Sequence, residues 1–370
     1  MKNAFLKSLA AASLAVVMAL GSAMGPVPQM TQVKAESIVN TGNDLRGVWV
    51  SYMDYAALGM ANVTKAKYKA NVRKFLTSAK SNGLNAVFLQ VRSYDDAIWE
   101  SETFPASPYL SKKAKADVSA EDTYAYDPLE EFITIADSKN MEVHAWMNPY
   151  RVTRDYYLDP GVAGSRNRVL KAVDEVMEYE VDGIHFDDYF YHAPKGYVKN
   201  ANRNAPYQVS LTSTDKCKRV NQLVKAVYEA VHDANEDAVF GISPQANIPN
   251  DMNAGADVYT WLREDGYIDY LVPQIYWTDN YGSGGRVKMF TDRLNQFMGI
   301  KKNKAKMYAG LALYHAGTSV ASDPGWGMRT NNLATQASLV KARGGNGYIL
   351  FSARFLSAPH TAAERGNLFR

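Results

Sequence analysis

The stretch Val181-Asp-Gly-Ile-His-Phe-Asp-Asp-Tyr-Phe-Tyr191 is an apolar run that leads directly into two neighbouring carboxylates. Because side chains alternate between the two faces of a strand, His185 and Asp187 are expected on the same face as Gly183. An ionised carboxylate at the end of a buried strand is costly unless it is paired or hydrogen-bonded. The expected partners of Asp187 are His185 and Arg151.

Seven further apolar runs flank this stretch along the chain, at residues 45–52, 86–92, 142–147, 239–243, 270–276, 306–312 and 347–352. Between them lie segments with helical spacing, at residues 68–82, 128–140, 166–179, 214–234, 258–264, 287–299 and 330–342. Strands that alternate with helices predict a parallel sheet, and eight such units predict a closed (β/α)₈ barrel. An open doubly wound sheet is the alternative, but it usually carries a glycine-rich phosphate loop after its first strand. No such loop follows the first run.

The first 35 residues have the pattern of a secretory signal peptide. A short basic segment precedes an apolar run at residues 8–20, and Val33-Lys-Ala35 and Gly21-Ser-Ala23 are two candidate cleavage sites. The run is shorter than the ~20 residues that span a bilayer, and no cysteine follows it to accept a lipid. We therefore predict a signal peptide at 1–35, a polar lead-in at 36–43 and one barrel domain at 44–370. After cleavage of the signal peptide, the protein is expected to be secreted or cell-wall associated, without a membrane anchor.

Charge and cysteine content exclude several classes of partner. The formal net charge is +3, but the predicted signal peptide contains Lys2, Lys7 and Lys34, so the rest of the chain is close to neutral. The sequence contains no basic patch of the kind that would indicate nucleic acid as a partner. Cys217 is the single cysteine and can form neither an internal disulfide nor a cysteine-based metal site. The 24 Tyr and 6 Trp suit stacking on sugar rings, although a large β-rich core also uses aromatic residues.

Polar and aromatic residues gather where the predicted strands end, which is where the active site of a (β/α)₈ barrel lies. Glycoside hydrolysis uses two carboxyl groups, one as acid and one as nucleophile or base. Asp187 is predicted as the nucleophile or base. Asp96 is the preferred second carboxyl, with Asp188 and Asp95 as alternatives, because consecutive strand residues face opposite ways unless the strand has ended. The predicted substrate-binding residues are Arg92, His144, Asn148, Arg151, His185, Tyr189, Gln274, Tyr276 and Trp277.

His144 and His185 lie on neighbouring predicted strands and, with Asp187, could hold a metal ion. No His-x-His, His-x-x-x-His or Glu-x-x-His spacing supports that reading, so hydrogen bonding is the preferred role of both rings. We predict no metal and no cofactor.

Six motifs resemble the glycosyl hydrolase-like 10 family of exported bacterial (β/α)₈ proteins, over residues 44–357. They are Leu45-Arg-Gly-Val-Trp-Val, Val91-Arg-Ser-Tyr-Asp-Asp-Ala97, Glu142-Val-His-Ala-Trp-Met-Asn-Pro-Tyr-Arg151, Asp182-Gly-Ile-His-Phe-Asp-Asp-Tyr-Phe-Tyr191, Gly241-Ile-Ser-Pro244 and Ile268-Asp-Tyr-Leu-Val-Pro-Gln-Ile-Tyr-Trp277. The resemblance implies a hydrolase of glycan chains, notably of peptidoglycan strands stripped of their peptides. It matches polar positions at Arg92, Asp96, His144, Asn148, Arg151, His185, Asp187, Asp188, Tyr189, Gln274 and Tyr276.

The chain departs from this family in two places, Lys216-Cys-Lys-Arg-Val-Asn221 and Gln245-Ala-Asn-Ile-Pro249. The motif around Asp187 also resembles that of chitinase-type barrels, but Tyr189 stands where those enzymes carry their acidic Glu. The resemblance to chitinases therefore does not identify an acid. Two alternatives stay open, namely a barrel that binds glycan without cleaving it and a hydrolase of another extracellular polysaccharide.

Overall fold

The apolar runs form the strands of a parallel barrel in the computed structural model, which describes residues 36–42, 44–110, 124–192, 195–199 and 206–370. The predicted signal peptide lies outside the described residues. Neighbouring strands in the main sheet follow the order β10-β11-β1-β2-β3-β5-β7-β8-β9. Their bounds are β1 Leu45–Val50, β2 Ala86–Arg92, β3 Glu142–Met147, β5 Gly183–Phe186, β7 Val239–Ile242, β8 Tyr270–Leu271, β9 Lys306–Met307, β10 Ala309–Leu311 and β11 Gly347–Phe351.

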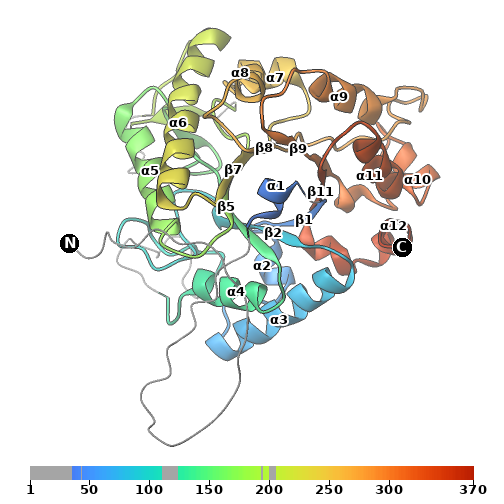
Figure 1. The fold of residues 1–370 in the computed structure, drawn as a ribbon, viewed down its shortest axis with the longest axis horizontal. Coiled ribbons are helices and arrows are strands. Elements are labelled where there is room, and N and C mark those ends of the chain that lie inside the picture. The colour runs from blue at the N-terminus through green and yellow to red at the C-terminus, as the bar shows by residue number, and fades with distance from the viewer. Residues whose placement is uncertain (1–35, 43, 111–123, 193–194, 200–205) are drawn as a thin grey trace, which may run out of the picture. The chain divides into compact units, whose positions relative to one another are not determined.

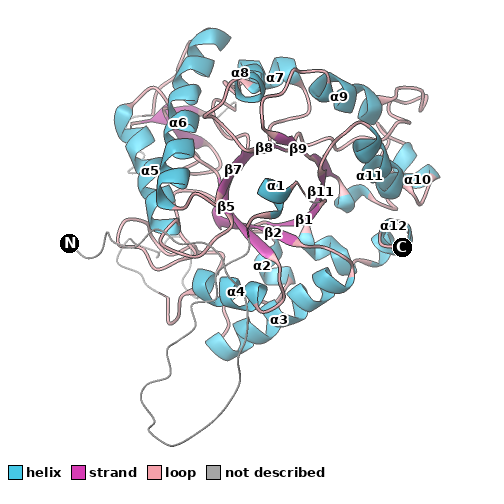
Figure 2. Cartoon of the chain, in the orientation of Figure 1, coloured by secondary structure: helices cyan, strands magenta, loops and turns pink. Residues whose placement is uncertain are grey.

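The seventh apolar run closes the ring of strands. Tyr308 divides this run into β9, which pairs with β8, and β10, which pairs with β11. A further parallel bridge joins Gln274 to Gly310 across the same seam. The nine segments of the main sheet therefore correspond to the eight predicted strands, and Figure 2 shows them as a ring surrounded by helices.

The helices that follow the strands lie outside this ring (Figure 1). The longer ones are α3 Lys65–Ser81, α4 Pro128–Asp137, α5 Ala163–Val176, α6 Ser213–Ala234, α9 Met289–Met298 and α11 Asn332–Ala342. The shorter ones are α2 Asp54–Ala57, α7 Ile248–Asn253, α8 Val258–Arg263, α10 Gly325–Met328 and α12 Ala362–Leu368. The start of α4 follows from its sequence, because the Asp127 side chain accepts from the backbone N–H groups of Leu129 and Glu130 and Pro128 takes the first turn. No helix among the described residues is long and apolar enough to cross a bilayer.

Two apolar layers hold the barrel together. The larger lies between the strands and the helices, and the smaller fills the barrel with side chains such as Trp49, Phe88, Trp146, Tyr270 and Tyr308. The strands are thus buried on both faces, which explains their nearly continuous apolar sequences. A small second sheet, in which β4 (Tyr156–Leu158) pairs with β6 (Gly196–Val198), was not predicted because each strand is only three residues long.

A short helix, α1 (Ile38–Thr41), covers the end of the barrel where the strands begin. The Ile38 N–H donates to Glu142, the first residue of β3, and the Asn40 side chain donates to the Asp237 carbonyl just before β7. Val39 is buried in the interior layer. Residues 36–42, predicted as a polar lead-in, therefore contribute to the barrel, and Figure 1 shows α1 within the ring.

Candidate functional site

Asp187 and Asp188 lie side by side at the carboxyl end of β5. The strand ends at Phe186, so the alternation of side chains no longer separates the two carboxyl groups. The Asp188 N–H donates to Asp187 Oδ1 at 2.8 Å, and the two side chains are also hydrogen-bonded to each other. The structure therefore brings Asp188, one of the alternative second carboxyls, to Asp187.

The two carboxyl groups have different surroundings. Burial raises the pKa of Asp187 well above its ordinary value, and the neighbouring Asp188 charge raises it further. Burial also raises the pKa of Asp188, but hydrogen bonds from Asp187 and Gln245 and the charge of Arg151 favour its ionised form. Both pKa values are thus raised, and two carboxyls that share a buried site favour a form in which the pair retains a proton.

Two glutamines and one histidine complete the ring of polar groups around the pair. Gln274 Nε2 donates to Asp187 Oδ1 at 2.9 Å and to the Ser243 carbonyl at 2.9 Å. Gln245 Nε2 lies 2.8 Å from His192 Nδ1, and that same ring nitrogen lies 3.9 Å from Asp188 Oδ2. His192 was not among the predicted site residues, because nothing in its local sequence pattern places it next to Gln245.

The preferred second carboxyl, Asp96, is hydrogen-bonded within its own turn and not to Asp187. Its Oδ1 accepts from the backbone N–H groups of Ser93 and Tyr94, at 3.1 and 2.8 Å, and so holds the turn after β2. Asp95 is tied to two arginines instead, at 2.7 Å from Arg92 and 2.8 Å from Arg168. Burial opposes the ionisation of Asp95, but these two cations outweigh it and lower its pKa. Both carboxyls therefore have structural partners.

Four of the predicted substrate-binding residues lie beneath the site rather than in it. Arg92, His144, Asn148 and His185 are each 0% exposed. Arg92 donates to the carbonyls of Asn148 and Pro149 at 2.8 and 3.0 Å, which fixes the loop after β3. The other five predicted contacts are partly exposed, namely Arg151, Tyr189, Gln274, Tyr276 and Trp277.

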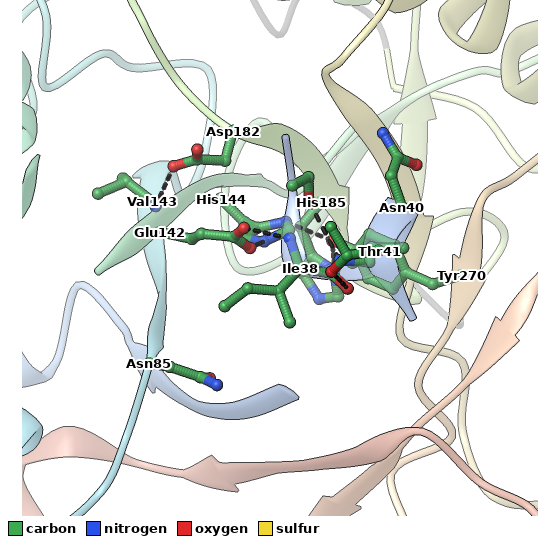
Figure 3. Close-up of polar contacts among 12 residues, drawn as sticks. Ile38, Asn40, Thr41, Asn85, Glu142, Val143, His144, Asp182, His185 and Tyr270 are labelled. Carbon is green, nitrogen blue, oxygen red and sulfur yellow. Dashed lines mark hydrogen bonds and ion pairs between the residues drawn. The ribbon is translucent and has the colours of Figure 1, made fainter. Parts of the chain in front are cut away.

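His144 and His185 belong to a chain of hydrogen bonds through the barrel interior (Figure 3). Glu142 Oε2 lies 3.2 Å from His144 Nε2, and the Tyr270 hydroxyl lies 3.1 Å from His144 Nδ1 and 3.2 Å from His185 Nδ1. His185 Nε2 then contacts Ser243 Oγ at 3.1 Å and the Trp49 indole N–H at 3.2 Å. Burial lowers the pKa of His185 well below its usual value, so its ring is neutral.

Neither of the expected partners of Asp187 is among its hydrogen bonds. His185 points into the interior chain, and Arg151 acts by its charge on Asp188. Gln274 takes their place because β8 ends two strands away from β5 and brings its following residues over the barrel mouth.

A cavity of about 280 Å³ opens beside Gln274 and is lined by two of the predicted aromatic contacts, Tyr276 and Trp277. Its lining includes Gln245, Gln274, Tyr276, Trp277, Tyr314 and His315. The Tyr276 and Tyr314 rings meet edge to face, with centroids 5.8 Å apart. Because Gln274 both lines the cavity and binds Asp187, a sugar ring in the cavity would lie next to the carboxyl pair.

Comparisons with known proteins agree with this architecture. The model of the glycosyl hydrolase-like 10 family matches residues 44–155 and 151–328. Glycosyl hydrolase YngK of Bacillus subtilis strain 168 is 27% identical over 380 residues, which cover 88% of this chain and 71% of YngK. Glycosyl hydrolase DigH of Escherichia coli O6:H1 strain CFT073 is 27% identical over 381 residues, 86% of this chain and 84% of DigH.

The fold also has solved counterparts. The PgaB (BpsB) glycoside hydrolase domain from Bordetella bronchiseptica matches with a TM-score of 0.55 and 12% identity, over 88% of this chain and 99% of that domain. The (β/α)₈ fold and the family resemblance inferred from the sequence are both confirmed.

Proposed function

The chain belongs to the glycosyl hydrolase-like 10 family, and we propose that this glycoside hydrolase uses Asp187 and Asp188 as its reacting carboxyl groups. The observation that carries the proposal is the buried pair itself, in which two carboxyls in contact have raised pKa values and unequal surroundings. Pairs whose surroundings drive their pKa values apart supply an acid and a base at the same pH.

In this mechanism Asp187 donates its proton to the glycosidic oxygen as the bond to the sugar breaks. After the leaving group departs, Asp188, ionised near Arg151, accepts a proton from the water that attacks the sugar from the same side, because two carboxyls in contact are too close to act on opposite faces of the ring. The sequence favoured Asp187 as nucleophile or base. Its burial beside a second carboxylate instead favours the protonated form, so we assign it the acid role. Gln274 orients Asp187 through its 2.9 Å hydrogen bond.

The proposed substrate is the glycan of the bacterial cell wall, in strands stripped of their peptides. The family resemblance in the six sequence motifs supports this choice, and the cavity lined by Tyr276, Trp277 and Tyr314 supports a sugar ligand. The signal-peptide pattern of residues 1–35 supports export to the place where that glycan is found.

The test is reducing-end release from peptide-stripped peptidoglycan glycan by wild type, Asp187→Asn and Asp188→Asn. Asp174→Asn is the matched control, because Asp174 is an exposed carboxyl on the outer helix α5. We expect each site variant to lose about 100-fold or more in kcat, as general acid–base catalysis contributes about 10²- to 10⁴-fold. The control should keep wild-type activity.

Other results would point elsewhere. Release by wild type and by both site variants would remove the pair from its proposed role. Binding without release would favour a barrel that holds glycan without cleaving it. Release from a different polysaccharide alone would keep the reaction and replace the substrate.

A further inference from the structure

Arg151 is a cation at the mouth of the barrel that has no carboxylate partner among the described residues, unlike two neighbouring arginines. Its guanidinium carbon lies 4.7 Å from the ring centroid of Tyr94 and 4.4 Å from that of Tyr189. Among the described residues, no carboxylate oxygen lies within the 4.0 Å of an ion pair with it, and its Nε–H is buried without a hydrogen-bond partner. By contrast, Arg92 and Arg168 each contact Asp95.

The two tyrosine rings use the faces of the guanidinium but not its edge. Cation–π stacking takes place above and below the guanidinium plane, whereas all five N–H donors lie within that plane. Stacking therefore holds the Arg151 side chain in place and leaves its in-plane donors directed elsewhere. A planar fork of N–H groups matches the two oxygens of a carboxylate. Arg151 is half-buried, so a ligand can reach it.

The position of Arg151 ties this cation to the reacting pair. It follows β3, which pairs with β5, so it lies on one side of Asp187 and Asp188. Its charge acts on Asp188 without an ion pair. Gln274 and its cavity follow β8, on the other side of β5 in the ring. The site thus has a cationic side and a side lined by amides and aromatic rings.

Among the described residues, those that line the cavity carry no free positive charge, and the lining carboxylate Asp323 is buried and accepts from the Thr278 backbone N–H at 2.8 Å. Gln245 and Gln274 are neutral, and burial lowers the pKa of His315, so that ring is neutral as well. Such a lining suits an uncharged sugar, with amides for its polar substituents and aromatic rings for its apolar face.

We propose that Arg151 binds a carboxylate carried by the sugar on its side of the cleaved bond, so that the substrate is an anionic glycan. The cleaved bond then joins a carboxylate-bearing sugar at Arg151 to a neutral sugar in the cavity beside Gln274. The proposal rests on the proposed function, in which Asp187 and Asp188 act on a glycan, and it adds the charge and the order of the sugars.

The experiment compares equilibrium binding to two forms of the same ligand. Soluble fragments of peptide-stripped peptidoglycan glycan are used with their lactyl carboxylates free, or with those carboxylates converted to amides. The proteins are wild type, Arg151→Gln, Arg151→Lys and Arg46→Gln. Arg46 is an exposed arginine near the start of β1, at the opposite end of the barrel, and is the matched control.

Wild type should bind the free form about 10- to 100-fold more tightly than the amidated form, the range expected for a charge-assisted hydrogen-bonded pair. Arg151→Gln should bind both forms alike, at the affinity of wild type for the amide. Arg151→Lys should keep part of the preference, because it keeps the charge and loses the fork. Arg46→Gln should retain all of it. Equal binding of the two forms by wild type, or a full preference in Arg151→Gln, would overturn the proposal.

Reducing-end release on the same ligands separates this inference from the proposed function. Cleavage of both forms at equal rates, without a binding preference, would leave the hydrolase and remove the carboxylate site. A preference that depends on Arg151, without release from either form, would leave the carboxylate site and remove the hydrolase.

A uronic-acid oligosaccharide, tested alongside, distinguishes the source of the carboxylate. Binding that is tighter than to the lactyl form and depends on Arg151 would keep the carboxylate site and assign it to a uronic-acid glycan.

Discussion

Replacing Tyr270 by Phe should destabilise the protein through two histidines that it leaves behind. The Tyr270 hydroxyl joins His144 Nδ1 and His185 Nδ1, at 3.1 and 3.2 Å, and all three residues are 0% exposed. Without the hydroxyl, each ring keeps one buried polar nitrogen with no partner at the original position. An unsatisfied buried polar group costs about 1–3 kcal/mol, so the two nitrogens together give an expected loss of about 2–6 kcal/mol.

The loss can be expressed as a melting temperature. Unfolding entropy is about 2.1 cal/mol/K per residue, or about 0.7 kcal/mol/K for a unit of the size of Glu36–Arg370. A loss of about 2–6 kcal/mol then lowers Tm by about 3–9 °C. Differential scanning calorimetry at pH 7.5, where His185 is neutral in both the folded and unfolded states, is the direct assay.

Tyr308→Phe is the matched control for this experiment. Tyr308 lies in the same interior layer, with its ring centroid 5.8 Å from that of Tyr270. Its buried hydroxyl has no hydrogen-bond partner among the described residues, so its removal should leave Tm unchanged or raise it. If Tyr270→Phe lowered Tm no more than Tyr308→Phe, the interior chain would not contribute to stability and the reasoning would fail.

Three other changes have defined outcomes. Gln274→Ala removes a hydrogen bond that favours ionised Asp187, so the alkaline limb of the pH profile of kcat/KM should move to higher pH. The value of kcat/KM should also fall about 10-fold, because the proposed acid is oriented less well. An alkaline limb that did not move would count against Asp187 as the acid. Burial raises the pKa of Asp251 to about 9, so wild type loses stability as pH rises from about 4 toward 9. Asp251→Asn should therefore be more stable than wild type by a few kcal/mol at pH 7 and as stable as wild type near pH 3.5. Urea unfolding measures this, and the same midpoint for both proteins at both pH values would refute it. A Cβ at Gly241 would lie 2.2 Å from a carbon of the Tyr270 ring, so Gly241→Ala should lower Tm by at least as much as Tyr270→Phe. A Tm equal to that of wild type would show that the interior side chains can shift to accommodate the added methyl group.

The strands could be predicted because each is an uninterrupted apolar run, and the run at residues 306–312 was correctly taken as one barrel strand. Its division at Tyr308 could not be foreseen, since the break arises from pairing with different neighbours on each side. Three-residue strands such as β4 and β6 carry too little pattern to be recognised.

The candidate site was predicted in outline but not in its contacts. Alternation placed His185 and Asp187 on the inward face, yet it does not give the depth of each along the barrel. His185 lies in the barrel interior, where it contacts the Tyr270 hydroxyl, whereas Asp187 lies beyond the end of β5. Alternation also misled the prediction for Asp188, because side chains alternate between faces only within the strand and β5 ends at Phe186.

Residues that meet through the ring of strands were the hardest to find. The hydrogen bond between Gln274 and Asp187 joins positions 87 residues apart, and the one between His192 and Gln245 joins positions 53 apart. No local spacing encodes such contacts. Asp96 was preferred over Asp188 because strand alternation would separate Asp188 from Asp187, and the use of Asp96 for the backbone of its own turn is visible only in the folded chain.

The position of α1 bears on how the protein could be attached to a surface. Its contacts with Glu142 and Asp237 place residues 36–42 at the end of the barrel where the strands begin, opposite the Asp187–Asp188 pair. A bead, lipid or carrier protein joined ahead of Glu36 would leave the face with the proposed carboxyl pair turned away from the support. A long polymer could then enter the barrel mouth from solution without steric conflict with the support.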